Sequence, residues 1–584
     1  MTGVPHLTRV AAAVTASLAV GCLTACVQIP DHGAVVEVKQ GPPAPPVEVP
    51  DFNPRPPQPG AEPSAIVAGF LEAMEATPVQ TNKALLFLTK EGQAAWKPQQ
   101  AVVAYDGHAP PRGRRTVSVR LHGASRVGGG GQWLGRLSPD AEEVTFPMRK
   151  EDGEWRIARA PNALVVTRTF YEQAYQDASL YFFDPSGRIL VPEVVHVPQG
   201  QQLATSLVRD LLLGPRPAQA GVERSFIPAG LTVGLSVVVS PRGLATITLR
   251  GPDPAPISRK ATRLMLAQLA WTLRQDPTIR TFEVAVDGLQ ISDASGSSTF
   301  KVVGGGFNRY DPADANASQQ IYALRGGRLV SGQLNNPTPN TGPFGVTRQG
   351  IGAFAVSLDD TQVAATTPTS LLLGPVLGNR SPAPVLIGPG LLRPSWDFAR
   401  RLWEVQDLPG GADVLYVVHG RHHQLHVPGV SGHDVRRFLV SRDGSRLVAV
   451  VRGARSDHLV VSRLLYDTAG RPVGATRARR LTWTVRSGAR IRDIGWTSPT
   501  RVAVLEQLTR AQADVRILNV DGSTSPSEAT PRSVSGQVSG LATSPVGTQH
   551  PYAVQQHGLF DLAQSDTNVS QLLTQRLRHL TYAG

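Results

Sequence analysis

The sequence predicts a multidomain protein in which α+β and α/β domains precede an all-β domain, a C-terminal β-propeller of five or six blades. Its 584 residues exceed the length of one domain, since about 150 residues per domain is typical. Its 57 glycines and 48 prolines favour turn-rich β structure and at least one proline-rich linker. Pairs of predicted strands recur along residues 318–584, and this repetition predicts the propeller.

Residues 1–25 have the features of a lipoprotein signal peptide. Arg9 supplies a positive charge, and residues 10–21 form an apolar stretch. That stretch is too short to span a bilayer, which needs about 20 helical residues. It ends in Leu-Thr-Ala-Cys at residues 23–26, which resembles a bacterial lipobox. The resemblance implies that Cys26 is alkylated by diacylglycerol, that the chain is cut before it, and that its new amine is acylated.

The two cysteines, Cys22 and Cys26, have few other possible roles. A structural zinc site needs two further ligands. A disulfide between them would be lost with the signal peptide, because Cys22 precedes the cut. An ordinary cleaved signal with an incidental cysteine is the alternative. We therefore expect a lipid anchor that holds the protein at the extracytoplasmic face of the cell membrane, where two or three acyl chains bind stably.

Residues 26–63 are predicted to be a proline-rich tether. Proline is dense in this segment, and no apolar periodicity is present, as in linkers of polyproline-like conformation. At about 3.1 Å per residue, the tether would hold the folded domains up to roughly 100 Å from the membrane.

Residues 64–165 predict a small α+β domain, in which helices precede an antiparallel sheet. Ser64 is a candidate N-cap residue of the first helix. Asp152 and Gly153 form a turn between two strand patterns, which is a hairpin signal. This order of elements resembles the cone-shaped fold of nuclear-transport-factor-2-like (NTF2-like) domains. The apolar face of the first helix comprises Ile66, Val67, Phe70, Leu71 and Met74.

Residues 170–305 predict a second mixed domain of the α/β class. A hairpin turns at residues 184–187, and Leu203, Leu207 and Leu211 share one face of the following helix. The element order is β-β-α-β-β-α-β, with the motifs LLLGP, SFIPAG, QLAWTL and VAVDG in sequence. This arrangement resembles the GerMN domain, which is known from a spore-germination protein. The resemblance implies an extracytoplasmic recognition module without established catalytic residues.

Residues 318–584 contain internal repeats of a strand, a turn and a second strand. A serine marks each repeat, and the successive spacings are 38, 46, 57 and 46 residues. A period of about 40–47 residues is typical of propeller blades. Five such serines imply five blades, and residues 320–333 add either a sixth blade or the strand that closes the ring. The serines are Ser357, Ser395, Ser441, Ser498 and Ser544.

Positive charge is concentrated in the C-terminal part of the chain. The net charge is +13, and residues 321–584 alone hold 28 Arg or Lys against 17 Asp or Glu. Nucleic-acid binding is one interpretation of an arginine excess. The codon usage of a GC-rich genome is the other, and we expect no nucleic-acid partner. The 57-residue spacing indicates an inserted surface loop at 471–490 that could face anionic lipid or polymer. Its arginines are Arg471, Arg477, Arg479, Arg480, Arg486 and Arg490.

Five histidines lie close together in the segment VVHGRHHQLHVPGVSGH. Alternate histidines on a hairpin could bind zinc, whereas a solvated hairpin is the simpler interpretation. Neither a His-Glu-x-x-His motif nor a Gly-x-Ser-x-Gly motif occurs in the sequence. We therefore predict no catalytic residues, no metal and no cofactor. The five are His419, His422, His423, His426 and His433.

The complete arrangement of lipobox, tether, α+β domain, GerMN-like domain and propeller resembles the actinobacterial LpqB lipoprotein family. The pattern FLEAME…LTKEGQAAW…VAYDG fits its N-terminal region. The resemblance implies a non-enzymatic accessory protein that modulates the sensor histidine kinase of an Mtr-type two-component system, and thereby affects cell division and envelope homeostasis. The kinase sensor domain would bind the GerMN-like domain or the propeller. A receptor for an envelope polymer or small ligand, a propeller hydrolase and a structural spacer remain as alternatives.

Overall fold

A computed structural model describes ten segments of the chain. The predicted signal peptide, Cys26 and the predicted tether as far as residue 51 lie outside the described residues, as does Arg486. Within the described part, no helix combines the length and apolar character that crossing a membrane requires. The described segments are residues 52–219, 221–251, 258–313, 317–334, 336–483, 490–523, 530–556, 558–563, 570–572 and 577–584.

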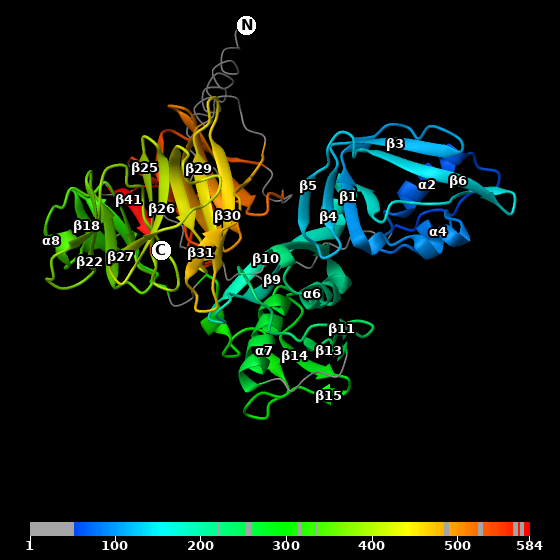
Figure 1. Cartoon of the computed structure of the whole chain (residues 1–584), viewed down its shortest axis with the longest axis horizontal. Coiled ribbons are helices and arrows are strands. Elements are labelled where there is room, and N and C mark those ends of the chain that lie inside the picture. Colours follow the sequence, from blue (N-terminus) through cyan, green and yellow to red (C-terminus); the bar gives the residue numbers. More distant parts are fainter. Residues whose placement is uncertain are drawn as a thin grey trace, which may run out of the picture. The chain divides into compact units, whose positions relative to one another are not determined.

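The N-terminal domain combines short helices with two four-stranded sheets (Figure 1). Its helices are α2 (Pro63–Ala73), α3 (Asn82–Leu85) and α4 (Lys90–Ala95). Its strands are β1 (Ala101–Tyr105), β2 (Gly107–His108), β3 (Thr116–His122), β4 (Ser125–Gly128), β5 (Trp133–Arg136), β6 (Glu143–Glu151), β7 (Glu154–Ile157) and β8 (Leu164–Thr167). The strand orders are β5-β4-β1-β8 and β2-β3-β6-β7. The likeness to NTF2-like domains stays a prediction.

Helix α2 supplies the core of this domain through the face that its periodicity predicts. Ile66, Val67, Phe70 and Leu71 are at most 3% exposed and pack in one cluster with residues of both sheets. The predicted N-cap at Ser64 is wrong, because the helix begins at Pro63. Proline is favoured in the first helical turn, where its missing N–H leaves no hydrogen bond unmade.

The second domain is built around the predicted hairpin and two helices. Its elements are α5 (Arg168–Ala174), β9 (Tyr175–Phe183), β10 (Leu190–Pro198), α6 (Leu203–Leu212), β11 (Thr232–Val233), β12 (Val238–Val239), β13 (Leu244–Arg250), α7 (Arg259–Leu273), β14 (Thr281–Val286), β15 (Leu289–Gln290) and β16 (Phe300–Lys301). Strands β9 and β10 pair antiparallel over nine residues each, and β13 pairs parallel with β14. The predicted stripe of Leu203, Leu207 and Leu211 is at most 4% exposed in a core that includes α7.

The C-terminal domain contains six antiparallel sheets, five of four strands and one of five, among the described residues. The first sheet holds β17 (Ile321–Arg325), β18 (Arg328–Gln333), β19 (Asn336–Pro339) and β41 (Arg578–Tyr582), and α8 (Pro343–Val346) follows it in the chain. The second holds β20 (Ala353–Val356), β21 (Gln362–Thr366), β22 (Ser370–Pro375) and β23 (Ala383–Ile387). The third holds β24 (Ser395–Trp396), β25 (Leu402–Leu408), β26 (Gly411–Val418) and β27 (Arg421–Gln424).

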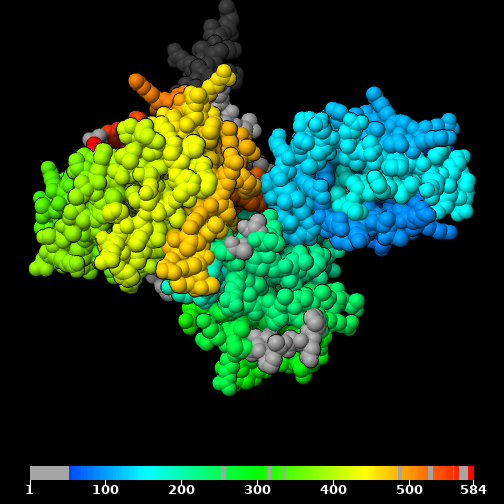
Figure 2. Space-filling model, in the orientation of Figure 1, coloured from blue at the N-terminus to red at the C-terminus, as the bar shows by residue number. Residues whose placement is uncertain are grey.

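The remaining three sheets follow in chain order. The fourth holds β28 (Val435–Val440), β29 (Arg446–Val451), β30 (His458–Tyr466), β31 (Pro472–Ala475) and β32 (Arg479–Arg480). The fifth holds β33 (Ile491–Ser498), β34 (Arg501–Thr509), β35 (Gln512–Asn519) and β36 (Arg532–Ser535). The sixth holds β37 (Val538–Ala542), β38 (Tyr552–Gln555), β39 (Gly558–Asp561) and β40 (Ser570–Leu572). The sequence colours of these sheets succeed one another from green to orange across the surface in Figure 2.

The sheets form a closed ring, because a separate apolar cluster joins each sheet to the next. Tyr322 and Phe354 connect the first sheet to the second, and four further clusters continue this pattern to the sixth. The last cluster joins the sixth sheet to the first through Ala542 and Ala323. Strand β41 pairs with β17, so the end of the chain completes the sheet in which the domain begins. Residues 320–333 therefore contribute strands to the sheet that the C-terminal strand completes.

Two of the repeated serines, Ser357 and Ser441, fix the turn between the first two strands of their blades. Ser357 Oγ donates to Asp359 Oδ1 at 2.7 Å and accepts from the Gln362 amide at 2.9 Å. Ser441 repeats this geometry, donating to Asp443 at 2.6 Å and accepting from the Arg446 amide at 3.0 Å. The serine is conspicuous in the sequence because this turn recurs in the fold.

The segment at 471–490 is not simply the inserted loop that its spacing predicts. It contains β31 and β32, which both pair with β30. Strand β30 is nine residues long, so it has room for two short partners on the same edge. Part of the extra length between Ser441 and Ser498 therefore forms strands of the fourth sheet.

Candidate functional site

A cavity of about 700 Å³ lies where the first strands of the blades begin. Such a volume lies within the range of small-molecule sites, about 300–1,000 Å³. The innermost strands of a propeller surround its axis, so residues near their starts gather at one end of the central channel. Every sheet contributes a lining residue at or just before its innermost strand: Ala353, Arg393, Arg437, Asp493, Leu541 and His579.

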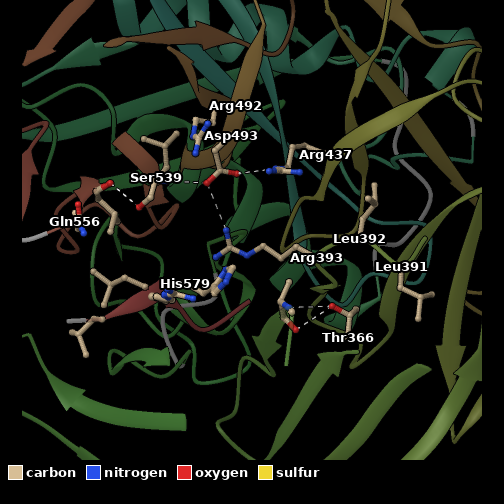
Figure 3. Close-up of a pocket in the computed structure, with 18 of the residues that line it drawn as sticks. Thr366, Leu391, Leu392, Arg393, Arg437, Arg492, Asp493, Ser539, Gln556 and His579 are labelled. Atoms are coloured by element: carbon tan, nitrogen blue, oxygen red, sulfur yellow. Dashed lines mark hydrogen bonds and ion pairs between the residues drawn. The ribbon is translucent and has the colours of Figure 1, made fainter. Parts of the chain in front are cut away.

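Among the described lining residues, the charged side chains of this cavity are four arginines and one aspartate. Figure 3 shows Arg393 and Arg437 approaching Asp493 from two sides. The Arg437 Nε–Asp493 Oδ1 distance is 3.7 Å, and the Arg393 Nη1–Asp493 Oδ2 distance is 4.0 Å. Both exceed ordinary hydrogen-bond length, so Asp493 lies near the two guanidinium groups without closing a tight pair. The remaining arginines are Arg492 and Arg578.

Backbone amides donate hydrogen bonds to both carboxylate oxygens of Asp493. Its Oδ1 accepts from the Ile494 amide at 3.0 Å, and its Oδ2 accepts from the Leu541 amide at 2.8 Å. Asp493 is 8% exposed, whereas Arg437 and Arg492 are exposed. The one negative charge is thus fixed in the wall, and guanidinium groups face the cavity.

The surplus of positive charge affects the ionisation of neighbouring groups. Loss of water around the ring lowers the pKa of His579, and the charge of Arg393 lowers it further. Burial also lowers the pKa of Arg393, and Asp493 offsets this only in part. Arginine nevertheless stays protonated at neutral pH, so the cavity is cationic while His579 is neutral.

The hydroxyl groups of the cavity are not arranged as nucleophiles. Ser539 Oγ donates to the Val554 carbonyl at 2.9 Å, and the Thr366 hydroxyl bonds to the backbone of Ala353. Among the described lining residues, no hydroxyl group is hydrogen-bonded to a histidine or a carboxylate.

Buried Arg442 occupies the opposite end of the innermost strands. Its guanidinium donates to the Ala313 carbonyl at 2.8 Å, to Ser544 Oγ at 3.2 Å and to the Ala583 carbonyl at 2.6 Å. Ser544 and Ala583 follow the innermost strands of the sixth and first sheets, whereas Arg442 follows that of the fourth. One side chain therefore links three blades across the axis.

A second polar cluster lies between the β9–β10 hairpin and the fourth blade. Arg446, which is 1% exposed, donates to the Pro192 carbonyl and lies 3.1 Å from Glu193 Oε1. Arg463 pairs with the same oxygen, and Gln219 donates to Glu193 Oε2 at 2.9 Å. Burial by itself would raise the pKa of Glu193, but the charges of Arg463 and Arg446 overcome it and lower that pKa.

A second carboxyl in this cluster behaves oppositely. Glu223 is 4% exposed. Its burial and the adjacent charge of Glu193 raise its pKa well above the ordinary value. Two carboxyl groups this close do not both ionise readily. The neighbouring arginines therefore favour the charged form of Glu193, whereas the surroundings of Glu223 favour its neutral form.

His196 contacts parts of all three folded domains. Its Nδ1 lies 3.1 Å from Asp177 Oδ1 on β9, and its Nε2 lies 3.4 Å from Asp521 Oδ2 in the propeller. Its amide donates to the Gly131 carbonyl of the N-terminal domain at 2.7 Å, and its ring lies 5.9 Å from that of Trp133. Burial lowers the pKa of His196, but the two carboxylates raise it to about 9.

The arginines predicted as an anionic-partner surface do not form one cluster. Arg471 pairs with Asp467 at 2.8 Å, and Arg490 pairs with Asp457 at 2.9 Å. Arg479 donates to the Val520 carbonyl at 3.3 Å. Arg477 and Arg480 are exposed. At least three of the five described arginines are thus held by partners within the chain.

The predicted histidine segment falls at the outer edge of the third blade. His422 and His423 lie on the edge strand β27, and His423 stacks on Tyr416 with ring centroids 5.0 Å apart. His433 contacts the Ser431 carbonyl at 3.2 Å. Across the described residues, no group of three or more His, Cys, Asp or Glu side chains could hold a metal ion.

The cavity residues were missed because they are scattered along the chain. Arg393 lies two residues before Ser395, Arg437 four before Ser441, and Arg492 six before Ser498. Ser395 begins its innermost strand, whereas the other repeated serines end or follow theirs. Comparing the positions two to six residues upstream across the repeats would have revealed three of the four arginines, Arg393, Arg437 and Arg492.

The fold and cavity define a multidomain β-propeller protein. Residues 56–172 match the LpqB lipoprotein N-terminal domain, and residues 327–572 match the LpqB lipoprotein β-propeller domain. Residues 179–292 match the Germane family, which is described by sporulation and spore germination. The chain belongs to the LpqB lipoprotein family.

Similarity to individual relatives extends over most of the chain. Lipoprotein LpqB of Thermobifida fusca is 27% identical, covering 88% of this chain and 90% of the relative. That of Mycobacterium bovis (strain BCG / Pasteur) is 28% identical, covering 85% and 86%. Neither name states an enzymatic activity. Among solved structures, a putative TolB from Agrobacterium tumefaciens is 13% identical with a TM-score of 0.29, covering 41% of this chain and 90% of that one.

Proposed function

We propose that this protein is a non-enzymatic accessory of a sensor histidine kinase. In this proposal, a lipid on Cys26 holds the chain at the extracytoplasmic face of the cell membrane. The folded domains bind the extracytoplasmic sensor domain of an Mtr-type kinase, and binding alters kinase activity, cell division and envelope homeostasis. Membership of the LpqB lipoprotein family supports this proposal.

The buried contact between the β9–β10 hairpin and the propeller is the structural observation that carries the proposal. Val194 on β10 packs in one apolar cluster with Val448 and Val461 of the fourth blade. The Glu193 ion pairs lie beside this cluster. The GerMN-like domain and the propeller can therefore present one preorganised surface, and preorganisation reduces the ordering cost of binding a partner.

A lipid anchor adds to this effect. Confining two proteins to one membrane makes their encounter a tethered event with a raised effective concentration. A weak binding surface can therefore suffice for a partner in the same membrane.

The test is site-specific photo-crosslinking in membranes followed by mass spectrometry. The chain has no lysine after Lys301, so amine-reactive reagents would not sample the propeller. A photoreactive residue is therefore placed at Leu235 of the GerMN-like domain or at Leu377 of the propeller, which are 100% and 66% exposed.

We expect kinase sensor-domain peptides to be captured from at least one of these positions. The Cys26→Ser protein, added in soluble form at the same concentration, serves as the control and should capture less kinase. Capture of other membrane proteins without the kinase, from both positions, would contradict the proposal.

A further inference from the structure

We propose that the cavity at the start of the propeller channel binds an organic anion, a sugar unit that carries phosphate or carboxylate groups. This site is separate from the buried hairpin contact and does not depend on the kinase proposal. Its ligand could be a free sugar phosphate or the repeating unit of an anionic envelope glycan, which share this chemistry.

The positive charge of the cavity favours a negatively charged ligand. Arg393, Arg437, Arg492 and Arg578 line the cavity, and Asp493 is the one carboxylate among the lining residues that the structure describes. Clefts that are lined by one sign of charge concentrate ions of the opposite sign. The four arginines come from different parts of the chain, so only the closed ring brings them together.

The guanidinium groups retain capacity to bind. Arg437 and Arg393 lie 3.7 and 4.0 Å from Asp493, and the two Asp493 oxygens already accept backbone amides. A guanidinium presents a planar fork that matches phosphate or carboxylate bidentately. An entering anion can therefore form shorter contacts than Asp493 does, without displacing Asp493 from its backbone partners.

The size and the remaining lining indicate a ligand larger than an inorganic ion. The cavity of about 700 Å³ also contains the amides of Gln537 and Gln556 and the apolar side chains of Leu391 and Leu541. Amide groups can bind sugar hydroxyls, and apolar side chains can cover a sugar ring, as in mixed small-molecule sites. Arg442 links the blades at the opposite end, so the ligand would enter from the arginine side.

The test is isothermal titration calorimetry of the full chain in detergent micelles at low ionic strength. Glucose 6-phosphate and glucuronic acid are the anionic probes, and glucose is the neutral control. We expect binding of an anionic sugar, no comparable binding of glucose, and weaker binding as salt rises because salt screens charge. Equal binding of glucose and both anionic sugars, or no binding of any probe, would overturn the proposal.

Matched arginine variants locate the site. Arg437→Gln/Arg492→Gln removes two exposed cavity arginines, and Arg380→Gln removes an exposed arginine of the second blade outside the cavity. The double variant should lose at least about tenfold in affinity, since a hydrogen bond to a charged group contributes about 1.5–3 kcal/mol. Arg380→Gln should stay within about twofold. Equal affinities of the two proteins would overturn the assignment.

Two further measurements keep this test decisive. Arg437→Lys retains the charge but not the planar fork, so it should also weaken binding. This variant replaces the double variant in the test if the Tm, recorded for each protein, shows that the double variant is unstable. The two ligand sources are separated by repeating the titration with a purified anionic cell-wall polymer. Binding of the monosaccharide alone indicates a free sugar phosphate, and tighter binding of the polymer indicates an envelope glycan.

Discussion

His196 and His579 show how surroundings decide the ionisation of one residue type. His196 lies between two carboxylates, which raise its pKa to about 9. His579 lies in the arginine-lined cavity, where loss of water and neighbouring positive charge lower its pKa. At neutral pH, His196 is therefore a cation that joins domains, whereas the lowered pKa of His579 favours its neutral form.

The pKa of His196 predicts a pH-dependent stability. Its pKa is raised from 6.5 to about 9 on folding. The stabilisation is therefore fully present below pH 6.5 and is lost as the pH rises through 9. The shift corresponds to about 3 kcal/mol of stability. Denaturant unfolding at several pH values, followed by the fluorescence of Trp133 and the other tryptophans, measures this loss.

His196→Gln provides the control for that prediction. It removes the titrating group while retaining a polar side chain, so its stability should change less between pH 6.5 and 9. A variant with the same pH dependence as the natural protein would contradict this role. Hydrogen exchange of the residue 196 amide, which donates to the Gly131 carbonyl, gives a local measurement at the same contact.

At the scale of elements, the β9–β10 hairpin belongs to one domain and packs against another. Glu193→Gln leaves Arg446 and Arg463 buried beside an uncharged amide. Loss of one member of a buried ion pair costs about 3–5 kcal/mol of folding stability, so we expect a clear decrease in Tm. We also expect limited proteolysis to cut the chain between the hairpin and the propeller faster than in the natural protein.

The same substitution at the neighbouring carboxyl should behave differently. Burial and the charge of Glu193 raise the pKa of Glu223 well above its ordinary value, which favours its neutral form. Glu223→Gln should therefore change stability by less than about 1 kcal/mol at pH 7, or increase it slightly. Calorimetry of both variants in one buffer compares them. Equal losses of stability in Glu193→Gln and Glu223→Gln would contradict the opposite pKa shifts of the two carboxyl groups.

At the scale of the whole molecule, the predicted lipid anchor would determine where the proposed binding surfaces act. Cys26→Ser removes the sulfur that the signal predicts to be acylated. We expect an unprocessed or released protein with unchanged folding of residues 52–584. Membrane fractionation and mass spectrometry of the N-terminus test this expectation, and unchanged acylation and membrane retention of the variant would contradict it.

The propeller could be predicted from sequence because its structure repeats. The turn that holds Ser357 recurs at Ser441 with the same hydrogen bonds, and a recurring turn leaves a recurring pattern. Likewise, the apolar stripe of α2 and the turn of the β9–β10 hairpin follow from local periodicity and turn chemistry. The start of α2 was misplaced because Ser64 and the preceding proline both favour a helix N-terminus.

The sequence by itself determined the domain order, the repeating blades and the predicted site of lipid attachment, since each is encoded in neighbouring residues. Tertiary structure alone decided that Arg393, Arg437, Arg492 and Arg578 share one cavity and that Glu193 meets Arg446. The physical reason is ring closure and domain packing. They bring together side chains that are dozens to hundreds of residues apart, and no local pattern records such a contact.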